Sequence, residues 1–122
     1  MQTFVVVNER NNEVIGSRIR LADTPKLRSK GLLGKKSLES GEGLMIRPCW
    51  SIHTAFMRFS LDVLYIDRQG GVMKVVSNLQ PFRISGAWGA RDTIELPAGA
   101  LDGLDIRRGD RLAYRPVPVP VP

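Results

Sequence analysis

The sequence predicts an α+β fold that is mainly β, a small antiparallel β-barrel or rolled sheet with one short helix. Three observations support this class. Gly and Pro interrupt the 122-residue chain at short intervals, which is typical of many short strands. The apolar runs between them are strand-like in length and composition. Only one segment carries both start and stop signals of a helix.

The chain opens with a predicted hairpin. Residues 4–7 and 14–21 flank the turn-rich stretch 8–12. In the second strand Ile15 and Ile19 are apolar, whereas Arg18 and Arg20 share the opposite parity. This alternation predicts a half-buried strand.

The helix is predicted within ADTPKLRSKGLLG, residues 22–34. Thr24 suits the N-cap, and Pro25 suits the first helical position, where a missing N–H has no cost. Gly31 suits the C-cap. We expect about two helical turns.

The remaining elements are predicted as strands and tight turns. Residues 44–46 form a short strand that ends before Pro48, and residues 61–67 and 72–79 form a hairpin around Arg68-Gln69-Gly70-Gly71, because paired glycines supply the positive φ of a tight turn. Residues 93–96 and 111–114 are strands joined by a compact turn or single helical turn over 97–110. We expect one globular domain over 1–115 and an extended or disordered Pro-Val tail over 116–122.

The net charge of +6 is concentrated in one stretch. Residues 18–36 hold seven basic residues against Asp23 alone, and the rest of the chain has eleven basic and eleven acidic residues. A solvated face explains such a patch, and so does contact with phosphates, an acidic partner or a membrane surface. Nucleic-acid binding stays a weaker alternative, since no aromatic residue interleaves with the patch and no known motif is present.

Composition also predicts the compartment. A single cysteine makes no internal disulfide, which suits a reducing environment. The first residues do not resemble a secretory signal, and no apolar run approaches the ~20 residues of a membrane helix. We therefore expect a cytoplasmic protein.

Asp62 is the first candidate functional residue. It lies in LDVLYID, where both faces of the predicted strand are apolar, so its carboxylate needs a cation or several hydrogen-bond donors. Arg28, Arg58 and His53 are candidate partners. Asp62 either ties a loop down through backbone N–H groups or lies at the floor of a pocket.

His53 and Cys49 are the only residues of their types. In an extended segment they lie about 13 Å apart, too far for a thiol–imidazole pair. One Cys and one His do not make a zinc site. His53 is either a packed core histidine or part of a site wall, and we assign no catalytic residue, metal or cofactor.

Two further features suggest contact surfaces. Trp50 and Trp88 stand beside proline or glycine in loop-like segments, which favours a binding surface. Glu95 lies between apolar neighbours in Ile-Glu-Leu-Pro and, like Asp62, either faces a pocket or pairs with an arginine.

The motifs together resemble the domain of unknown function 192 family of bacterial and archaeal proteins. The resemblance covers residues 13–114 and depends on ADTPKLRSKGLLG, GEGLMI, SIHTAFMRFSLDVLYID and ELPAGALDGLDIRRGDRL in that order. It implies a compact, mainly β, barrel-like α+β domain without an established activity. The positions that match the family pattern are Arg28, Gly31, Leu32, Gly34, Gly43, Asp62, Glu95, Leu96, Gly99, Gly109 and Asp110.

This chain departs from the common family pattern in one segment and at one further position. Many members have Trp-Met-Lys-Asn-Thr where this chain has residues 53–57, so it resembles the branch with Ile-His-Thr and Phe-Met-Arg. A proline before Leu-Asp in many members is Ser60 here. A ligand set by the polar Asn-Thr pair is therefore not carried over.

We expect a binding module, not an enzyme, with a pocket between the 24–34 helix and the 52–66 segment. Arg28 anchors an anionic or hydroxylated ligand, and Asp62 and Glu95 orient Arg28 or accept ligand donors. The wall consists of His53, Thr54 and Met57. The alternatives are a hydrolase or lyase using Asp62 and His53, and nucleic-acid binding through residues 18–36. The partner is an unknown small molecule or protein.

Overall fold

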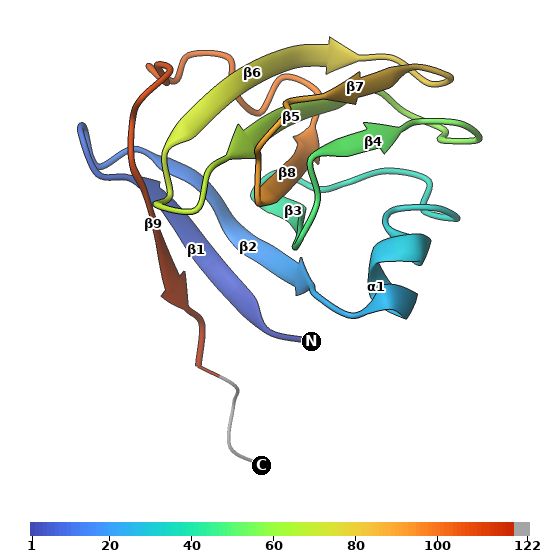
Figure 1. The fold of residues 1–122 in the computed structure, drawn as a ribbon, viewed down its shortest axis with the longest axis horizontal. Coiled ribbons are helices and arrows are strands. Elements are labelled where there is room, and N and C mark those ends of the chain that lie inside the picture. Colours follow the sequence, from blue (N-terminus) through green and yellow to red (C-terminus); the bar gives the residue numbers. More distant parts are fainter. Residues whose placement is uncertain (119–122) are drawn as a thin grey trace.

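The computed structural model describes residues 1–118 and shows a curled seven-stranded sheet that forms a half-barrel, with a two-stranded ribbon and one short helix beside it (Figure 1). The elements are β1 (Thr3–Asn8), β2 (Val14–Ala22), α1 (Pro25–Lys30), β3 (Glu42–Ile46), β4 (Ser51–His53), β5 (Leu61–Ile66), β6 (Val72–Leu79), β7 (Ile84–Gly86), β8 (Asp92–Pro97) and β9 (Leu112–Pro116). The mainly β fold with one short helix is therefore confirmed.

The large sheet has the order β6-β5-β8-β3-β2-β1-β9, and β4 pairs with β7 in a separate ribbon. Neighbours are antiparallel except β2 and β3, which are parallel. A parallel pair needs a crossover connection, and α1 with the loop that follows supplies it. The helix therefore lies beside the sheet rather than within it (Figure 1).

The helix follows its capping signals. Thr24 is extended, and its hydroxyl accepts a hydrogen bond from the Leu27 N–H at 3.2 Å. Pro25 is the first helical residue, and Gly31 ends the helix at a φ of 50°, a conformation that favours glycine. The predicted caps at Thr24 and Gly31 are confirmed, and the helix spans Pro25–Lys30, shorter than the 24–34 segment assigned to the predicted pocket.

The large sheet is apolar on both faces. Every residue of β5 is buried, and alternate residues point to opposite faces of a strand. Leu64 and Ile66 belong to one buried cluster, which the 97–106 connection covers through Leu101 and its neighbours. Val63 and Tyr65 belong to a second cluster, which α1 and the β4–β7 ribbon cover.

The ribbon was missed by the sequence prediction. Its two strands are three residues each, and residues 51–53 pair with residues 84–86. Such short strands carry too little periodicity to detect, and their partners lie more than 30 positions apart. The segment that we assigned to the site wall is thus partly a strand.

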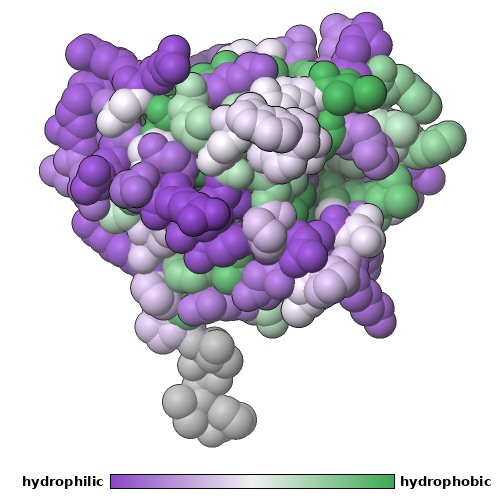
Figure 2. Space-filling view, in the orientation of Figure 1, coloured by the Kyte–Doolittle hydropathy of each residue, from purple (hydrophilic) through white to green (hydrophobic). Residues whose placement is uncertain are grey.

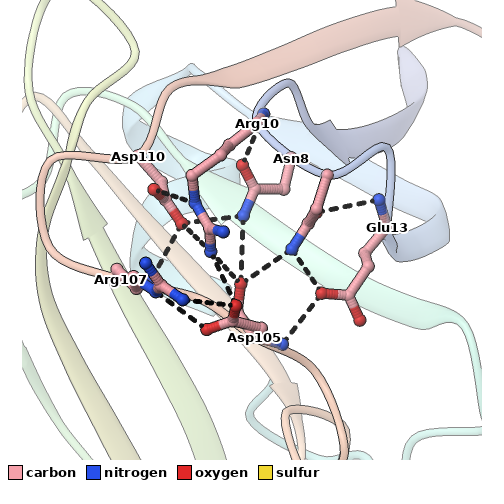
Figure 3. Close-up of polar contacts among 7 residues, drawn as sticks. Asn8, Arg10, Glu13, Asp105, Arg107 and Asp110 are labelled. Carbon is pink, nitrogen blue, oxygen red and sulfur yellow. Dashed lines mark hydrogen bonds and ion pairs between the residues drawn. The ribbon is translucent and has the colours of Figure 1, made fainter.

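A polar network joins the β1–β2 turn to the loop before β9 (Figure 3). The Asp110 carboxylate accepts hydrogen bonds from the Asn8 side-chain amide, from Arg10 Nε and from the Arg107 N–H, each at 2.8 Å. Arg10 is the largest cause that holds the pKa of Asp110 well below its usual range. All of these contacts tie two loops together, so we assign the network to the scaffold.

The C-terminal prediction extends past the described part of the chain. Pro116 is the last residue of β9, and the Val117 N–H donates to the Thr3 carbonyl oxygen at 2.9 Å. Residues 119–122 of the predicted tail lie outside the described residues.

Candidate functional site

A cavity of about 420 Å³ opens between α1 and the β4–β7 ribbon. Figure 2 shows the same region as a hollow on the right of the view, beside hydrophobic surface. We call it the Glu95 cavity after the carboxyl group on its sheet wall. One wall consists of residues 28–33, which form the end of α1 and the turn after it. The other lining residues are Ile46, Pro48–His53, Ala55, Met57 and Glu95.

Four predicted site residues line this cavity: Arg28, His53, Met57 and Glu95. Arg28 is half-buried and its Nη1 donates to the Asp23 carbonyl oxygen at 3.3 Å. His53 is exposed on β4, and Met57 packs at the edge of the second cluster. The structure thus brings together side chains from α1, the ribbon and the sheet.

Glu95 is the most unusual of the four. It lies in β8 opposite Leu44 of β3 and Val63 of β5, so its side chain is on the face covered by α1 and the ribbon. The residue is 6% exposed, and burial raises its pKa to about 7. No side chain or backbone group of residues 1–118 hydrogen-bonds its carboxyl.

The close approach of β3 to β8 depends on Gly43. A Cβ at this position would lie 2.6 Å from the Glu95 carbonyl oxygen and 2.9 Å from a Leu96 methyl group. Because Cβ atoms do not pack at such distances, only glycine at position 43 allows β8, which carries Glu95, to lie this close to β3. The resemblance included Gly43, and the structure supplies the reason.

Asp62 and Thr54 do not line the cavity. The Asp62 carboxylate accepts hydrogen bonds from the backbone N–H groups of Asn78, Gly99 and Leu101 at 2.9, 3.1 and 3.0 Å. It is 1% exposed and ties the 97–101 turn and the end of β6 to β5. The sequence left two roles for Asp62, a loop anchor and the floor of a pocket. The structure shows the loop anchor.

This placement removes the acid–base alternative. Asp62 is 1% exposed and both of its oxygens accept backbone hydrogen bonds, whereas His53 is exposed on β4, so the two side chains do not form an acid–base pair. The predicted role of Asp62 as an acceptor for a ligand or for Arg28 is likewise wrong.

Thr54 is buried and links the end of β4 to the loop before β7 through hydrogen bonds. Its hydroxyl donates to the Gln80 carbonyl oxygen at 2.7 Å and accepts from the Arg83 N–H at 2.8 Å. The predicted place of Thr54 in the wall is wrong, because these bonds turn its side chain toward the 80–83 loop.

Cys49 was not predicted as a site residue, yet its side chain lines the cavity. Its thiol donates to the Ser51 carbonyl oxygen at 3.2 Å. Burial raises the pKa of this thiol; the Glu95 carboxyl raises it further and Arg28 lowers it. A thiol with a raised pKa is neutral and weakly nucleophilic.

The site offers no metal set. Within residues 1–118, no three His, Cys, Asp or Glu side chains lie close enough to hold an ion. The arrangement instead presents an uncompensated carboxyl, a guanidinium and an apolar wall. Groups of these types suit contacts with both polar and apolar parts of a small molecule.

The basic stretch is partly neutralised by acidic neighbours. Arg18 pairs with Glu39 at 3.1 Å, and Lys35 approaches Glu42 at 3.5 Å. No helix of the described residues is long and apolar enough to cross a membrane.

Comparison with known proteins places the chain among uncharacterised relatives. The model of the DUF192 family, described as uncharacterized ACR, matches residues 5–114. A UPF0127 protein of Pyrococcus horikoshii is 33% identical over 90% of this chain and 98% of its own length, and one of Thermococcus sibiricus is 28% identical over 90% and 74%.

Two solved structures share the fold. A protein from Sinorhizobium meliloti, described as a candidate transcription regulator, has a TM-score of 0.79 at 20% identity, covering 93% of this chain and 92% of that one. A protein of unknown function from Novosphingobium aromaticivorans has a TM-score of 0.77 at 23% identity, covering 91% and 83%. At these identities the likeness concerns the fold.

Proposed function

We propose that this chain, which belongs to the DUF192 family, is a small-molecule binding module whose ligand occupies the Glu95 cavity. The proposal rests on one observation: a carboxyl group that is 6% exposed faces the cavity without a hydrogen-bond partner among the described residues. Burying an unpaired ionisable group destabilises a fold. Such a local violation is expected at functional positions.

The cavity walls favour one chemical class of ligand. Arg28 and Lys30 provide positive charge at the α1 side and suit a carboxylate or phosphate. Glu95, with a pKa of about 7, donates to or accepts from a hydroxyl group near neutral pH. Ile46, Ile52 and Met57 provide the apolar wall. A hydroxylated anion with a short hydrocarbon part therefore fits best, and the cavity volume of about 420 Å³ is within the range of small-molecule sites.

A thermal-shift screen against hydroxy acids, sugar acids, nucleotides and peptidoglycan fragments tests the proposal. A ligand present at about a hundred times its dissociation constant adds roughly 2.7 kcal/mol of stability, which moves the unfolding midpoint by several degrees. We expect Arg28→Gln and Glu95→Gln to remove the shift. Glu39→Gln, which changes an exposed carboxylate outside the cavity, is the matched control and should keep it.

Alkylation of Cys49 gives a second measurement. It is the chain's only cysteine and lines the cavity, so a bound ligand should slow its reaction with iodoacetamide. A ligand that shifts the midpoint equally in all variants and leaves the Cys49 rate unchanged binds elsewhere, and the proposal is then wrong. A cytoplasmic location, where this thiol stays reduced, remains part of the proposal.

Nucleic-acid binding through residues 18–36 is the second candidate. Arg20 Nε is a fully buried side-chain nitrogen without a hydrogen-bond partner in the described residues, and a similar structure is described as a candidate transcription regulator. Affinity for duplex DNA should then fall steeply as salt rises and should fall further in Arg20→Gln. Absence of binding at low salt contradicts this candidate.

A further inference from the structure

The outer face of the β4–β7 ribbon carries five large hydrophobic side chains that the fold does not bury. Their exposed fractions are 48% for Trp50, 76% for Phe56, 63% for Phe82, 85% for Ile84 and 82% for Trp88. We call these five residues the aromatic strip. Figure 2 shows hydrophobic surface gathered on the right of the view, where Figure 1 places the outer ends of β4 and β7.

The strip has one aromatic pair at each end of the ribbon. Trp50 and Trp88 meet edge to face at 4.8 Å, and Phe56 and Phe82 do so at 5.6 Å. Between the two pairs, Ile84 lies opposite His53 in the ribbon register. The alternate residues Ile52 and Ser85 point inward, where Ile52 packs in the second cluster and Ser85 bonds the Tyr65 hydroxyl.

The two phenylalanines occupy backbone positions that do not suit them. Phe56 has a φ of 63° and Phe82 a φ of 60°, a region in which a bulky residue is strained and Asn or Gly is favoured. Thr54 holds both turns in place through its contacts with Gln80 and Arg83 and through its carbonyl oxygen, which accepts from the Phe82 N–H at 3.0 Å. Their ring contact offsets only part of this strain, so neither side chain is explained by the stability of the monomer.

The charged side chains of the two ribbon segments have one sign. Residues 47–60 and 80–91, which contain the ribbon and its flanks, have four arginines and no Asp or Glu. Arg47 and Arg91 are paired with Asp92, whereas no described carboxylate pairs with Arg58, Arg83 or the nearby Arg68. A partner that complements this face is therefore apolar where it touches the aromatic strip and negatively charged around that contact.

We propose that the aromatic strip docks the protein on an anionic phospholipid surface. Tryptophan and phenylalanine partition into the boundary between headgroups and acyl chains, and unpaired arginines add attraction to anionic lipid. An aliphatic side chain at the centre of the strip favours lipid over single-stranded nucleic acid, whose bases stack on aromatic faces. This docking is peripheral and differs from ligand binding in the Glu95 cavity, although Trp50 belongs to the strip and also lines that cavity.

The chain supplies its own reporter for the test. Trp50 and Trp88 are its only tryptophans, and both lie in the strip. Titration with phosphatidylcholine vesicles that contain phosphatidylserine should shift tryptophan emission to the blue, and vesicles of phosphatidylcholine alone should do so much more weakly. Flotation of the protein with the vesicles measures the same binding without relying on fluorescence.

The variant Phe56→Asn/Phe82→Asn separates docking from folding. Asn fits the positive-φ positions, so the thermal midpoint should be unchanged or higher, while vesicle affinity should fall about tenfold or more. Val14→Asn, which removes an exposed apolar side chain on β2, is the matched control and should leave vesicle affinity unchanged.

Charge is tested by Arg58→Gln/Arg83→Gln, which should weaken binding to anionic vesicles roughly 30-fold at low salt. Arg115→Gln, on β9 and outside the ribbon, should have little effect. Binding that is equal for neutral and anionic vesicles, or unaffected by both double variants, overturns the proposal. Absence of vesicle binding together with quenching by oligothymidylate also overturns it and assigns the strip to single-stranded nucleic acid.

Discussion

Asp62 and Glu95 are two buried carboxyl groups on neighbouring strands, and the fold treats them in opposite ways. In the β5–β8 pair, Asp62 is opposite Leu96 and Glu95 is opposite Val63. These two pairs are adjacent in the ladder, so the two carboxyl groups point to opposite faces of the sheet. Asp62 accepts three backbone hydrogen bonds. Glu95 accepts none from any described residue, and burial raises its pKa to about 7. Both positions were candidates for the same site by sequence.

The difference separates scaffold from site. A carboxylate surrounded by backbone N–H groups holds loops together, and removing it leaves those donors unpaired. A carboxyl that the protein itself does not satisfy gains hydrogen bonds only from something that enters the cavity. Burial alone therefore does not identify a functional acid; the donors around it do.

The largest expected effect is that of Asp62→Ala. Loss of the acceptor leaves the N–H groups of Asn78, Gly99 and Leu101 unsatisfied, and we expect a loss of roughly 4 kcal/mol in the free energy of unfolding. Urea denaturation at neutral pH measures it. Asp102→Ala, an exposed aspartate in the same connection, should change stability little. A loss for Asp62→Ala as small as that of the control would contradict the anchoring role.

Glu95→Gln should raise the free energy of unfolding above neutral pH, whereas Asp62→Ala lowers it. The folded-state pKa of about 7 is above the value of 4.5 expected for an unfolded chain, so the folded protein binds more protons between these values. Wild-type stability should then fall as pH rises from about 4.5 to about 7, by about 3 kcal/mol in total. The Gln variant should lack this slope and should be more stable than the wild type at pH 8.

Unfolding measured across this pH range in both proteins tests the contrast. A wild type whose stability is flat between pH 4.5 and 7 would show that Glu95 has a partner or is hydrated, and the basis of the proposed function would be lost.

The smallest effect concerns the Asp110 network. The folded-state pKa of Asp110 is depressed, so its contribution is present above the unfolded value of 3.8 and is lost as pH falls below it. Arg10→Gln removes the largest cause of that depression and should make the protein unfold at a higher pH on acidification. An acid-unfolding profile identical to that of the wild type would contradict this assignment.

Much of the secondary structure was predictable because its signals are local. The Thr24 cap, Pro25 and Gly31 lie within one short segment, and the paired glycines after Arg68 fix the β5–β6 turn. The position of Asp62 between apolar neighbours predicted a buried carboxylate, with either a cation or several donors as its partner, and the residue is 1% exposed. It did not distinguish an anchor from a pocket floor, because those donors come from residues 78, 99 and 101.

The sequence by itself determined the mainly β class, the helix and its ends, and the need of two apolar strands to accommodate an acid. The tertiary structure alone decided that residues 51–53 pair with residues 84–86, that Thr54 turns inward, and that Cys49 lines the same cavity as Arg28 and Glu95. The reason is the sequence separation between the residues that interact. Caps and turns depend on neighbouring residues, whereas the partners of a buried side chain come from distant segments that only the closed sheet brings together.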